Sequence, residues 1–154
     1  MRKQTLTILC GLPGSGKSTW LQKNKRTDQD VICLDEIRDQ IFGHQFHRSA
    51  EPWIIAFAKS MARILLSQGR SLVIDSTALL PFIRNEWNAM AKHYGARTEV
   101  IYFDIPYEVC VERNRNRERK KRVPISVLKS FRGMLIAPDP DIERYDRVII
   151  IKNK

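Results

Sequence analysis

Residues 11–18 read Gly-Leu-Pro-Gly-Ser-Gly-Lys-Ser and match the pattern G-x-x-x-x-G-K-[ST] in full. Binding a phosphate requires backbone N–H groups that converge on the anion, and Gly14 and Gly16 permit the backbone conformations that this needs. The apolar run Leu6–Cys10 precedes the loop, and helical sequence begins around Lys17, so a helix amino terminus adds positive potential. A glycine-rich turn that merely caps a helix is the alternative, but the complete motif in this strand–helix frame favours phosphate binding.

Each residue of this loop has an expected task. Lys17 should reach the β- and γ-phosphates of a nucleotide, and the Ser18 hydroxyl should ligate Mg²⁺. The expected cofactors are therefore Mg²⁺ and ATP or a related nucleotide, and the choice of ATP is what the family resemblance described below implies. The other loop residues expected at the phosphates are Gly11, Pro13, Gly14, Ser15, Gly16 and Thr19.

A second candidate centre follows the next apolar run. Asp35 comes at the carboxyl end of that predicted strand, where doubly wound sheets place their ligands. Its carboxylate could accept the proton of an attacking hydroxyl, and Arg38 on the same helix face could bind a substrate phosphate with its planar fork. A plain N-cap role for Asp35 fits the spacing equally well. Glu36 and Asp39 are expected to face solvent.

Asp75 directly follows a third apolar run, Leu72–Ile74. In this position it resembles the acid that acts through the Mg²⁺ shell of nucleotide-binding loops. It could equally orient Arg38 by a charge-assisted hydrogen bond. A purely structural cap for the helix that begins at Pro81 is the alternative, but Asp75 lies six residues upstream of that proline, which favours a functional role.

The segment 106–124 is predicted to be a lid over the phosphates. Residues 113–122 hold seven basic side chains and one acid, Glu118, which gives a net charge of +6. Arg113 and Arg117 are four apart, so they should share one helix face and point together at the transferring phosphoryl group. The other basic side chains, Arg115, Arg119, Lys120, Lys121 and Arg122, would face elsewhere, towards a polynucleotide backbone or simply towards solvent.

These centres need a scaffold, and the alternation of apolar runs with helical periods predicts βαβ units around a parallel sheet. The strands expected are Leu6–Cys10, Val31–Leu34, Ser71–Ile74, Thr98–Phe103 and Arg147–Ile151, and helices should begin near Gly16, Asp35, Ala50, Pro81, Pro106 and Ile125. Two stripes at helical spacing should face the core: Ile54, Phe57, Met61 and Leu65, and then Ile83, Trp87, Met90 and Tyr94. The fold class is α/β, a three-layer αβα arrangement with about five parallel strands and a helical lid.

The composition narrows the class further. A chain of 154 residues with 27 Lys and Arg against 17 Asp and Glu is expected to form one domain, residues 1–154, with a polyanionic partner. The three cysteines are widely spaced, which favours reduced thiols in a cytoplasm, and the apolar runs are too short for a membrane span. The sequence lacks the Asn-Lys-x-Asp segment of a GTPase and is short for an ATPase motor, which leaves a small kinase.

Taken together, these motifs resemble the 5′-kinase domain of the phage and bacterial polynucleotide kinase–phosphatase family, a P-loop NTPase fold. The resemblance runs from Leu6 to about Leu135, and the segments that carry it are residues 11–20, Asp35-x-x-Arg38, Asp75-Ser-Thr and Arg113-Asn…Arg117…Val123-Pro124. It implies that Asp35 is the general base on a 5′-hydroxyl and that Arg38 contacts the substrate phosphate. It also implies that Arg113 and Arg117 stabilise the transferring phosphate and that Val123 and Pro124 lie near the adenine.

The lid departs from the family pattern, because it is more basic and about one residue longer. Arg115 or Arg119 could therefore take the place of Arg117. The 154 residues are not expected to include a phosphatase or ligase. Either the protein is a stand-alone kinase, or its end-healing partners are separate proteins. The leading hypothesis is transfer of the ATP γ-phosphate to 5′-hydroxyl ends of RNA or DNA. A kinase of a nucleoside, an antibiotic or a sugar nucleotide is the second hypothesis, and a nucleotide-gated RNA-binding module without transfer chemistry is the third.

Overall fold

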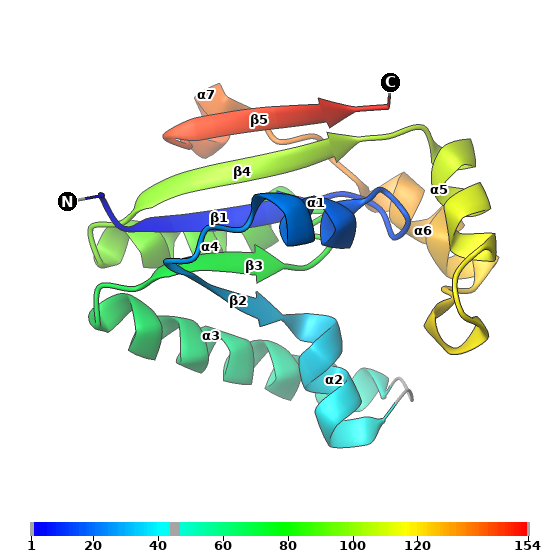
Figure 1. The fold of residues 1–154 in the computed structure, drawn as a ribbon, viewed down its shortest axis with the longest axis horizontal. Coiled ribbons are helices and arrows are strands. Elements are labelled where there is room, and N and C mark those ends of the chain that lie inside the picture. The colour runs from blue at the N-terminus through cyan, green and yellow to red at the C-terminus, as the bar shows by residue number, and fades with distance from the viewer. Residues whose placement is uncertain (1, 44–46, 154) are drawn as a thin grey trace.

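The computed structural model describes residues 2–43 and 47–153. Its centre is an all-parallel sheet of five strands in the order β2-β3-β1-β4-β5 (Figure 1). The strands are β1 (Thr5–Cys10), β2 (Gln29–Cys33), β3 (Ser71–Asp75), β4 (Arg97–Asp104) and β5 (Arg147–Lys152). All five strands predicted from the sequence are present, and their ends are shifted by at most two residues. The α/β fold with a five-stranded parallel sheet is thereby confirmed.

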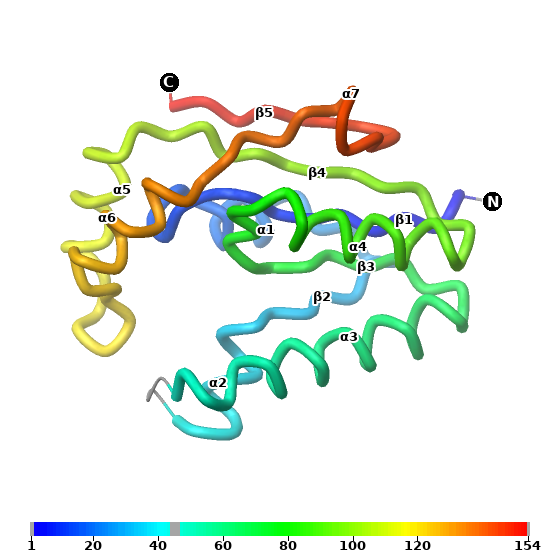
Figure 2. Tube along the Cα trace, turned by 180° about the vertical axis from the view of Figure 1, so that it is seen from behind, coloured from blue at the N-terminus to red at the C-terminus, as the bar shows by residue number. Residues whose placement is uncertain are grey.

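Helices cover both faces of the sheet, as Figures 1 and 2 show from opposite sides. The helices α3 and α4 lie on one face, α1 lies on the other, and α5 and α6 stand beyond the carboxyl ends of the strands. The helices are α1 (Lys17–Asn24), α2 (Leu34–Phe42), α3 (Glu51–Ser67), α4 (Pro81–His93), α5 (Tyr107–Arg115), α6 (Ile125–Met134) and the short α7 (Pro140–Glu143). Two 3₁₀ turns, η1 (Arg48–Ala50) and η2 (Arg119–Lys121), complete the described elements.

The core follows the two-residue alternation of the central strand. Leu6 and Ile8 of β1 are fully buried on the face covered by α3 and α4, and Leu9 is fully buried on the opposite face. On that opposite face, Trp20 and Leu21 of α1 pack against the second, smaller cluster. Burial on both faces explains why β1 reads as an apolar run and why its end is a firm support for the loop that follows.

One of the two apolar stripes is confirmed, and the other is partly wrong. Ile83, Trp87, Met90 and Tyr94 of α4 do pack against the core. On α3, however, the fully buried line is Ile54, Ala58, Ala62 and Leu66, while 52% of the Phe57 surface is exposed. The two alanines let α3 approach the sheet closely, and this turns the helix so that Phe57 lies outside the contact.

A buried ion pair joins α4 to α7. Arg84, which is fully buried, donates from Nε and Nη2 to the Glu143 carboxylate at 2.9 and 2.6 Å, and from Nη1 to the Ala78 carbonyl at 2.7 Å. The Tyr145 hydroxyl also donates to Glu143, at 2.6 Å. Burial alone would raise the pKa of Glu143, but the hydrogen bonds from Arg84 and Tyr145 hold it below its ordinary value. Through Ala78 this pair fixes the loop between Asp75 and α4.

Candidate active site

The phosphate-binding loop lies between β1 and α1, as expected, and is shaped by its glycines. Gly14 and Gly16 have φ angles of +83° and +96°, in the left-handed region. A Cβ added at Gly14 would lie 2.5 Å from the Cys110 carbonyl oxygen, so no side chain fits there. The Ser15 hydroxyl is buried and has no hydrogen-bond partner among the described residues. A buried polar atom without a partner inside a glycine-lined loop fits a ligand that accepts hydrogen bonds, such as a phosphate.

Lys17 is the electrostatic centre of this loop. Its Nζ donates to the carbonyl oxygens of Gly11 and Leu12 at 2.8 and 2.9 Å. Burial lowers the pKa of Lys17 to about 8; Asp75 and Asp35 oppose this shift, and the positive charge of Arg117 adds to it. Residues predicted on the acceptor side and on the lid are thus close enough to Lys17 for their charges to act on it.

Asp35, Arg38 and Glu51 form a continuous ion-pair assembly beside the loop. Arg38 donates from Nη1 to Asp35 at 2.5 Å, and from Nε and Nη2 to the two Glu51 oxygens at 2.6 and 2.9 Å. The Asp35 side chain remains 89% exposed, whereas the side chains of Arg38 and Glu51 are 24% and 22% exposed. A half-buried arginine therefore holds an open carboxylate in place, which suits a base that must reach a substrate.

The N-cap interpretation of Asp35 is wrong. The helix α2 begins at Leu34 with Cys33 as its N-cap, so Asp35 lies inside the first turn, where the helix dipole stabilises its charge. Glu36 and Asp39 are exposed, as expected. Glu51 was missed by the sequence analysis, because nothing in the sequence brings the first residue of α3 to α2.

Asp75 does not contact Arg38, so the orienting role considered for it falls instead to Glu51. Asp75 lies opposite Cys33 in the strand register. Burial raises the pKa of Asp75, while Lys17 opposes the shift. The carboxylate therefore lies on the Lys17 side of the sheet edge, in keeping with a role near the metal.

An exposed hydroxyl in the first turn of α1 fits a magnesium ion that is held mainly by its substrate. The described residues contain no group of three or more His, Cys, Asp or Glu side chains that could hold a metal. Ser18 is exposed at the first turn of α1, directly after Lys17. Mg²⁺ commonly keeps several waters and binds through one or two protein ligands plus phosphates. A single hydroxyl ligand, Ser18, beside the phosphate-binding loop is consistent with this type of coordination.

The segment predicted to be a lid lies against the phosphate-binding loop at α5 and then folds back on itself. Arg113 of α5 lies beside the loop, with Nη1 3.5 Å from the Gly14 oxygen and Nη2 3.3 Å from the Asn153 side chain. The buried Asn114 side chain donates to the Val123 carbonyl at 2.7 Å and accepts from the Val123 N–H at 2.9 Å. These two hydrogen bonds, which we call the Asn114 clasp, close the segment 115–122 into a compact loop.

Arg113 and Arg117 do not share a helix face, which corrects the sequence analysis. The helix α5 ends at Arg115, and Arg117 follows in a turn whose N–H donates to the Asn114 carbonyl. The charge of Arg117 nevertheless reaches Lys17. Val123 is half-buried, and Pro124 is exposed at the N-cap of α6, so both lie at the base of the lid.

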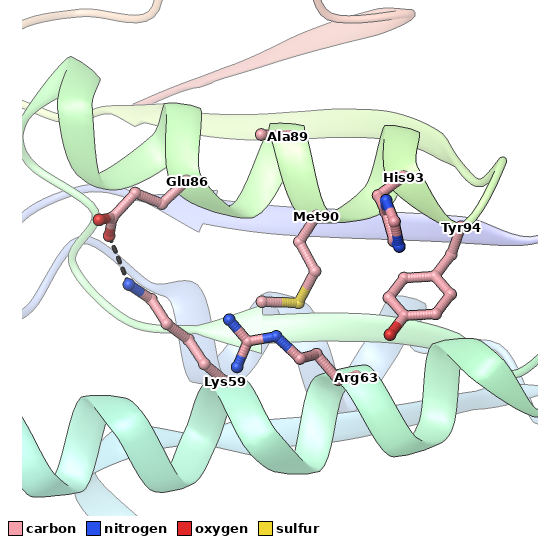
Figure 3. Close-up of a pocket in the computed structure, with 7 residues that line it drawn as sticks. All are labelled: Lys59, Arg63, Glu86, Ala89, Met90, His93 and Tyr94. Carbon is pink, nitrogen blue, oxygen red and sulfur yellow. Dashed lines mark hydrogen bonds and ion pairs between the residues drawn. The ribbon is translucent and has the colours of Figure 1, made fainter.

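A groove between α3 and α4 contains no predicted site residue. Figure 3 shows Lys59 and Arg63 of α3 facing residues of α4, with a 2.6 Å ion pair between Lys59 and Glu86. The groove is lined by Lys59, Arg63, Glu86, Ala89, Met90, His93 and Tyr94.

A strand, a glycine-shaped loop and a helix that surround a partly buried lysine, at the carboxyl edge of a parallel sheet, define a nucleotide-binding P-loop domain with the P-loop NTPase fold. The chain belongs to the AAA domain family AAA_33, whose sequence profile matches residues 6–138. In the described part of the chain, no helix is both long and apolar enough to cross a membrane.

Individual proteins are similar to this chain in sequence or in fold. The chain is 26% identical over 127 residues to a nucleotide-binding protein of Xylella fastidiosa strain M12, covering 82% of this chain and 39% of that protein. A chain of the Pnkp1/Rnl/Hen1 RNA repair complex has a TM-score of 0.75 at 23% identity, covering 88% of this chain and 45% of that one. An unliganded sugar kinase from Janibacter sp. has a TM-score of 0.66 at 24% identity, covering 98% and 86%. The chain thus spans about two fifths of the length of its curated relative, and the two structural likenesses establish the fold.

Proposed function

We propose that this protein is a polynucleotide 5′-hydroxyl kinase, which transfers the γ-phosphate of ATP to 5′-hydroxyl ends of RNA or DNA. The observation that carries the proposal is the exposed Asp35 carboxylate, held by Arg38 and Glu51 and close enough to Lys17 to affect its pKa. Pure nucleotide binding does not require such a carboxylate, whereas attack by a hydroxyl does.

In this mechanism Asp35 accepts the proton of the 5′-hydroxyl while the oxygen of that hydroxyl forms a bond to the γ-phosphorus of ATP. The bond from that phosphorus to the bridging oxygen breaks, and ADP leaves. Lys17, Arg113 and Arg117 stabilise the negative charge on the transferring group, and free N–H groups of Arg38 bind a phosphate of the acceptor. Mg²⁺, when bound at Ser18 and the phosphates, supplies further charge neutralisation.

The net charge of +6 over residues 113–122 supports a polynucleotide acceptor, and so does the fold shared with the chain from an RNA repair complex. The second candidate is a kinase of a small molecule. The fold shared with a sugar kinase favours it, since Asp35 would serve any hydroxyl acceptor.

The deciding experiment supplies γ-labelled ATP and Mg²⁺ together with one class of acceptor in each reaction. The acceptors are oligonucleotides of RNA and of DNA that carry either 5′-hydroxyl or 5′-phosphate ends, nucleosides, and sugars. We expect label on the hydroxyl ends only. If no oligonucleotide is labelled while nucleosides or sugars are, the acceptor is a small molecule and the proposal is wrong.

Asp35→Asn tests the role of the base within the same assay. We expect turnover to fall by roughly 10²-fold or more, with ATP affinity retained, because the amide cannot accept the proton. Lys17→Ala should weaken both turnover and ATP binding. Turnover by Asp35→Asn at the wild-type rate would remove Asp35 from the mechanism.

A further inference from the structure

The outer end of the lid carries a run of cations that the transfer step does not use. Arg119, Lys120, Lys121 and Arg122 are consecutive and exposed, and Arg119–Lys121 form the 3₁₀ turn η2. Within the residues that the structure describes, none of the seven basic side chains of 113–122 lies within ion-pair distance of a carboxylate. We call Arg119–Arg122 the basic tip.

The basic tip is held in a defined conformation despite its self-repulsion. The Asn114 clasp on Val123 closes the base of the loop, and Arg122 Nε donates to the Arg117 carbonyl at 2.8 Å. The Lys121 N–H donates to the Glu118 carbonyl at 2.8 Å. Four adjacent like charges in an ordered turn repel one another, and a bound polyanion would relieve this repulsion.

The geometry of the tip does not suit a single triphosphate. Successive side chains of a 3₁₀ turn point about 120° apart, so Arg119, Lys120 and Lys121 fan outward and do not converge on one point. Lys17 and Arg113 already lie at the phosphate-binding loop. Fanned cations match phosphates that are spaced along a strand.

The position of the tip also points to the acceptor side. In both views the loop that follows α5, drawn in yellow, extends from α5 towards the level of α2, which carries Asp35 and Arg38 (Figures 1 and 2). We infer that the basic tip binds the backbone phosphates of a single-stranded nucleic acid downstream of the nucleotide held at Asp35. This inference rests on the proposed function, and it makes the length of the strand a determinant of affinity.

The test uses three proteins: the wild type, the tip variant Arg119→Gln/Lys120→Gln/Lys121→Gln, and a matched control, Lys23→Gln/Lys25→Gln/Arg97→Gln. The control removes the same charge from exposed positions of α1, its C-cap and β4. Fluorescence anisotropy with a 5′-phosphorylated 12-nucleotide single strand, without ATP, measures binding independently of transfer. ATP affinity and the labelling of a dinucleotide and of a 12-mer with 5′-hydroxyl ends are measured in parallel.

We expect the tip variant to bind the 12-mer about tenfold or more weakly, and its plot of log K against log salt to be shallower by about 2, since each lost single-strand phosphate contact contributes about 0.7. Its ATP affinity and its labelling of the dinucleotide should match the control. Equal loss on the dinucleotide and the 12-mer, or loss of ATP affinity, would place the tip on the donor side and overturn the inference.

The binding arm separates this inference from the proposed function. If the wild type labels no oligonucleotide but binds the 12-mer through the tip, the kinase proposal fails and the nucleic-acid surface stands. If the wild type and the tip variant bind the 12-mer alike, the inference is wrong whatever the labelling shows. The single variants, each expected to change the salt slope by about 0.7, repeat the test should the triple variant not fold.

Discussion

At the scale of the residue, Glu51 is the side chain that holds Arg38 beside Asp35. It binds Arg38 through both carboxylate oxygens and fixes the guanidinium whose remaining branch holds Asp35. Arg38 is fixed by a partner thirteen residues away, on another helix. Glu51 touches no reacting atom in the proposed mechanism, so it acts by positioning.

Glu51→Gln should therefore lower kcat/KM for the acceptor by about tenfold, because the amide can accept only one of the two hydrogen bonds from Arg38 and carries no negative charge. ATP affinity should not change. The matched control is Glu36→Gln, since Glu36 is an exposed acid beside Asp35 with no hydrogen bond to Arg38 among the described residues. Equal effects of the two variants would show that Glu51 contributes only net charge.

Lys17 predicts a pH dependence of nucleotide binding. Its pKa is lowered to about 8, so it is protonated at pH 7 and mostly neutral at pH 9 in the free protein. Phosphates require the charged form, and ATP affinity should therefore fall by about tenfold between pH 7 and pH 9. Titration calorimetry measures this fall. Lys17→Arg, which stays charged over this range, should bind with an affinity that is independent of pH, and a fall of equal size in that variant would exclude Lys17 as the cause.

At the scale of the element, the lid depends on one buried amide. Asn114→Ala leaves the N–H and carbonyl of Val123 without their partner, which costs about 1–3 kcal/mol locally. Amide hydrogen exchange over 116–122 should become at least about fivefold faster, whereas Asn116→Ala, at an exposed position, should leave it unchanged. Adding ATP to the wild type should slow exchange over 113–122. Identical exchange in Asn114→Ala and the wild type would show that the clasp does not hold the loop.

Local patterns predicted the elements well, because burial on both faces of a parallel sheet leaves a clear apolar signature in strands such as β1 and β3. The same patterns gave wrong predictions where a contact between residues distant in the sequence determines the local structure. Phe57 has helical spacing, but the alanines of α3 set which side meets the sheet. The end of α5 is hidden inside a run of arginines, so Arg117 was placed on a helix that stops two residues earlier. Glu51 could not be found from spacing, since its contact spans two helices.

At the scale of the whole molecule, the ion pair of Arg84 and Glu143 joins segments that are distant in the chain. From the sequence alone both residues would be expected at the surface, because charged side chains are rarely buried unless they are paired. Here Arg84 of α4 binds Glu143 of α7 and also donates to the Ala78 carbonyl, and the Tyr145 hydroxyl donates a further hydrogen bond to Glu143. The site loop after Asp75 and the approach to β5 are thus fixed together.

Arg84→Met should destabilise the protein by about 3–5 kcal/mol, because it leaves the Glu143 charge buried without its partner. The double variant Arg84→Met/Glu143→Leu should cost less than the sum of the two single variants. Urea unfolding measures both. Arg70→Met, which breaks an exposed pair with Asp30, is the control and should cost less than about 1 kcal/mol. Additive costs at Arg84 and Glu143 would contradict the coupling.

The contact between Gly14 and the Cys110 carbonyl has a mechanical consequence. Any residue other than glycine at position 14 would have to displace the backbone of α5 or of the phosphate-binding loop. The distance between that loop and the helix that follows β4 is therefore set by the absence of a single methyl group.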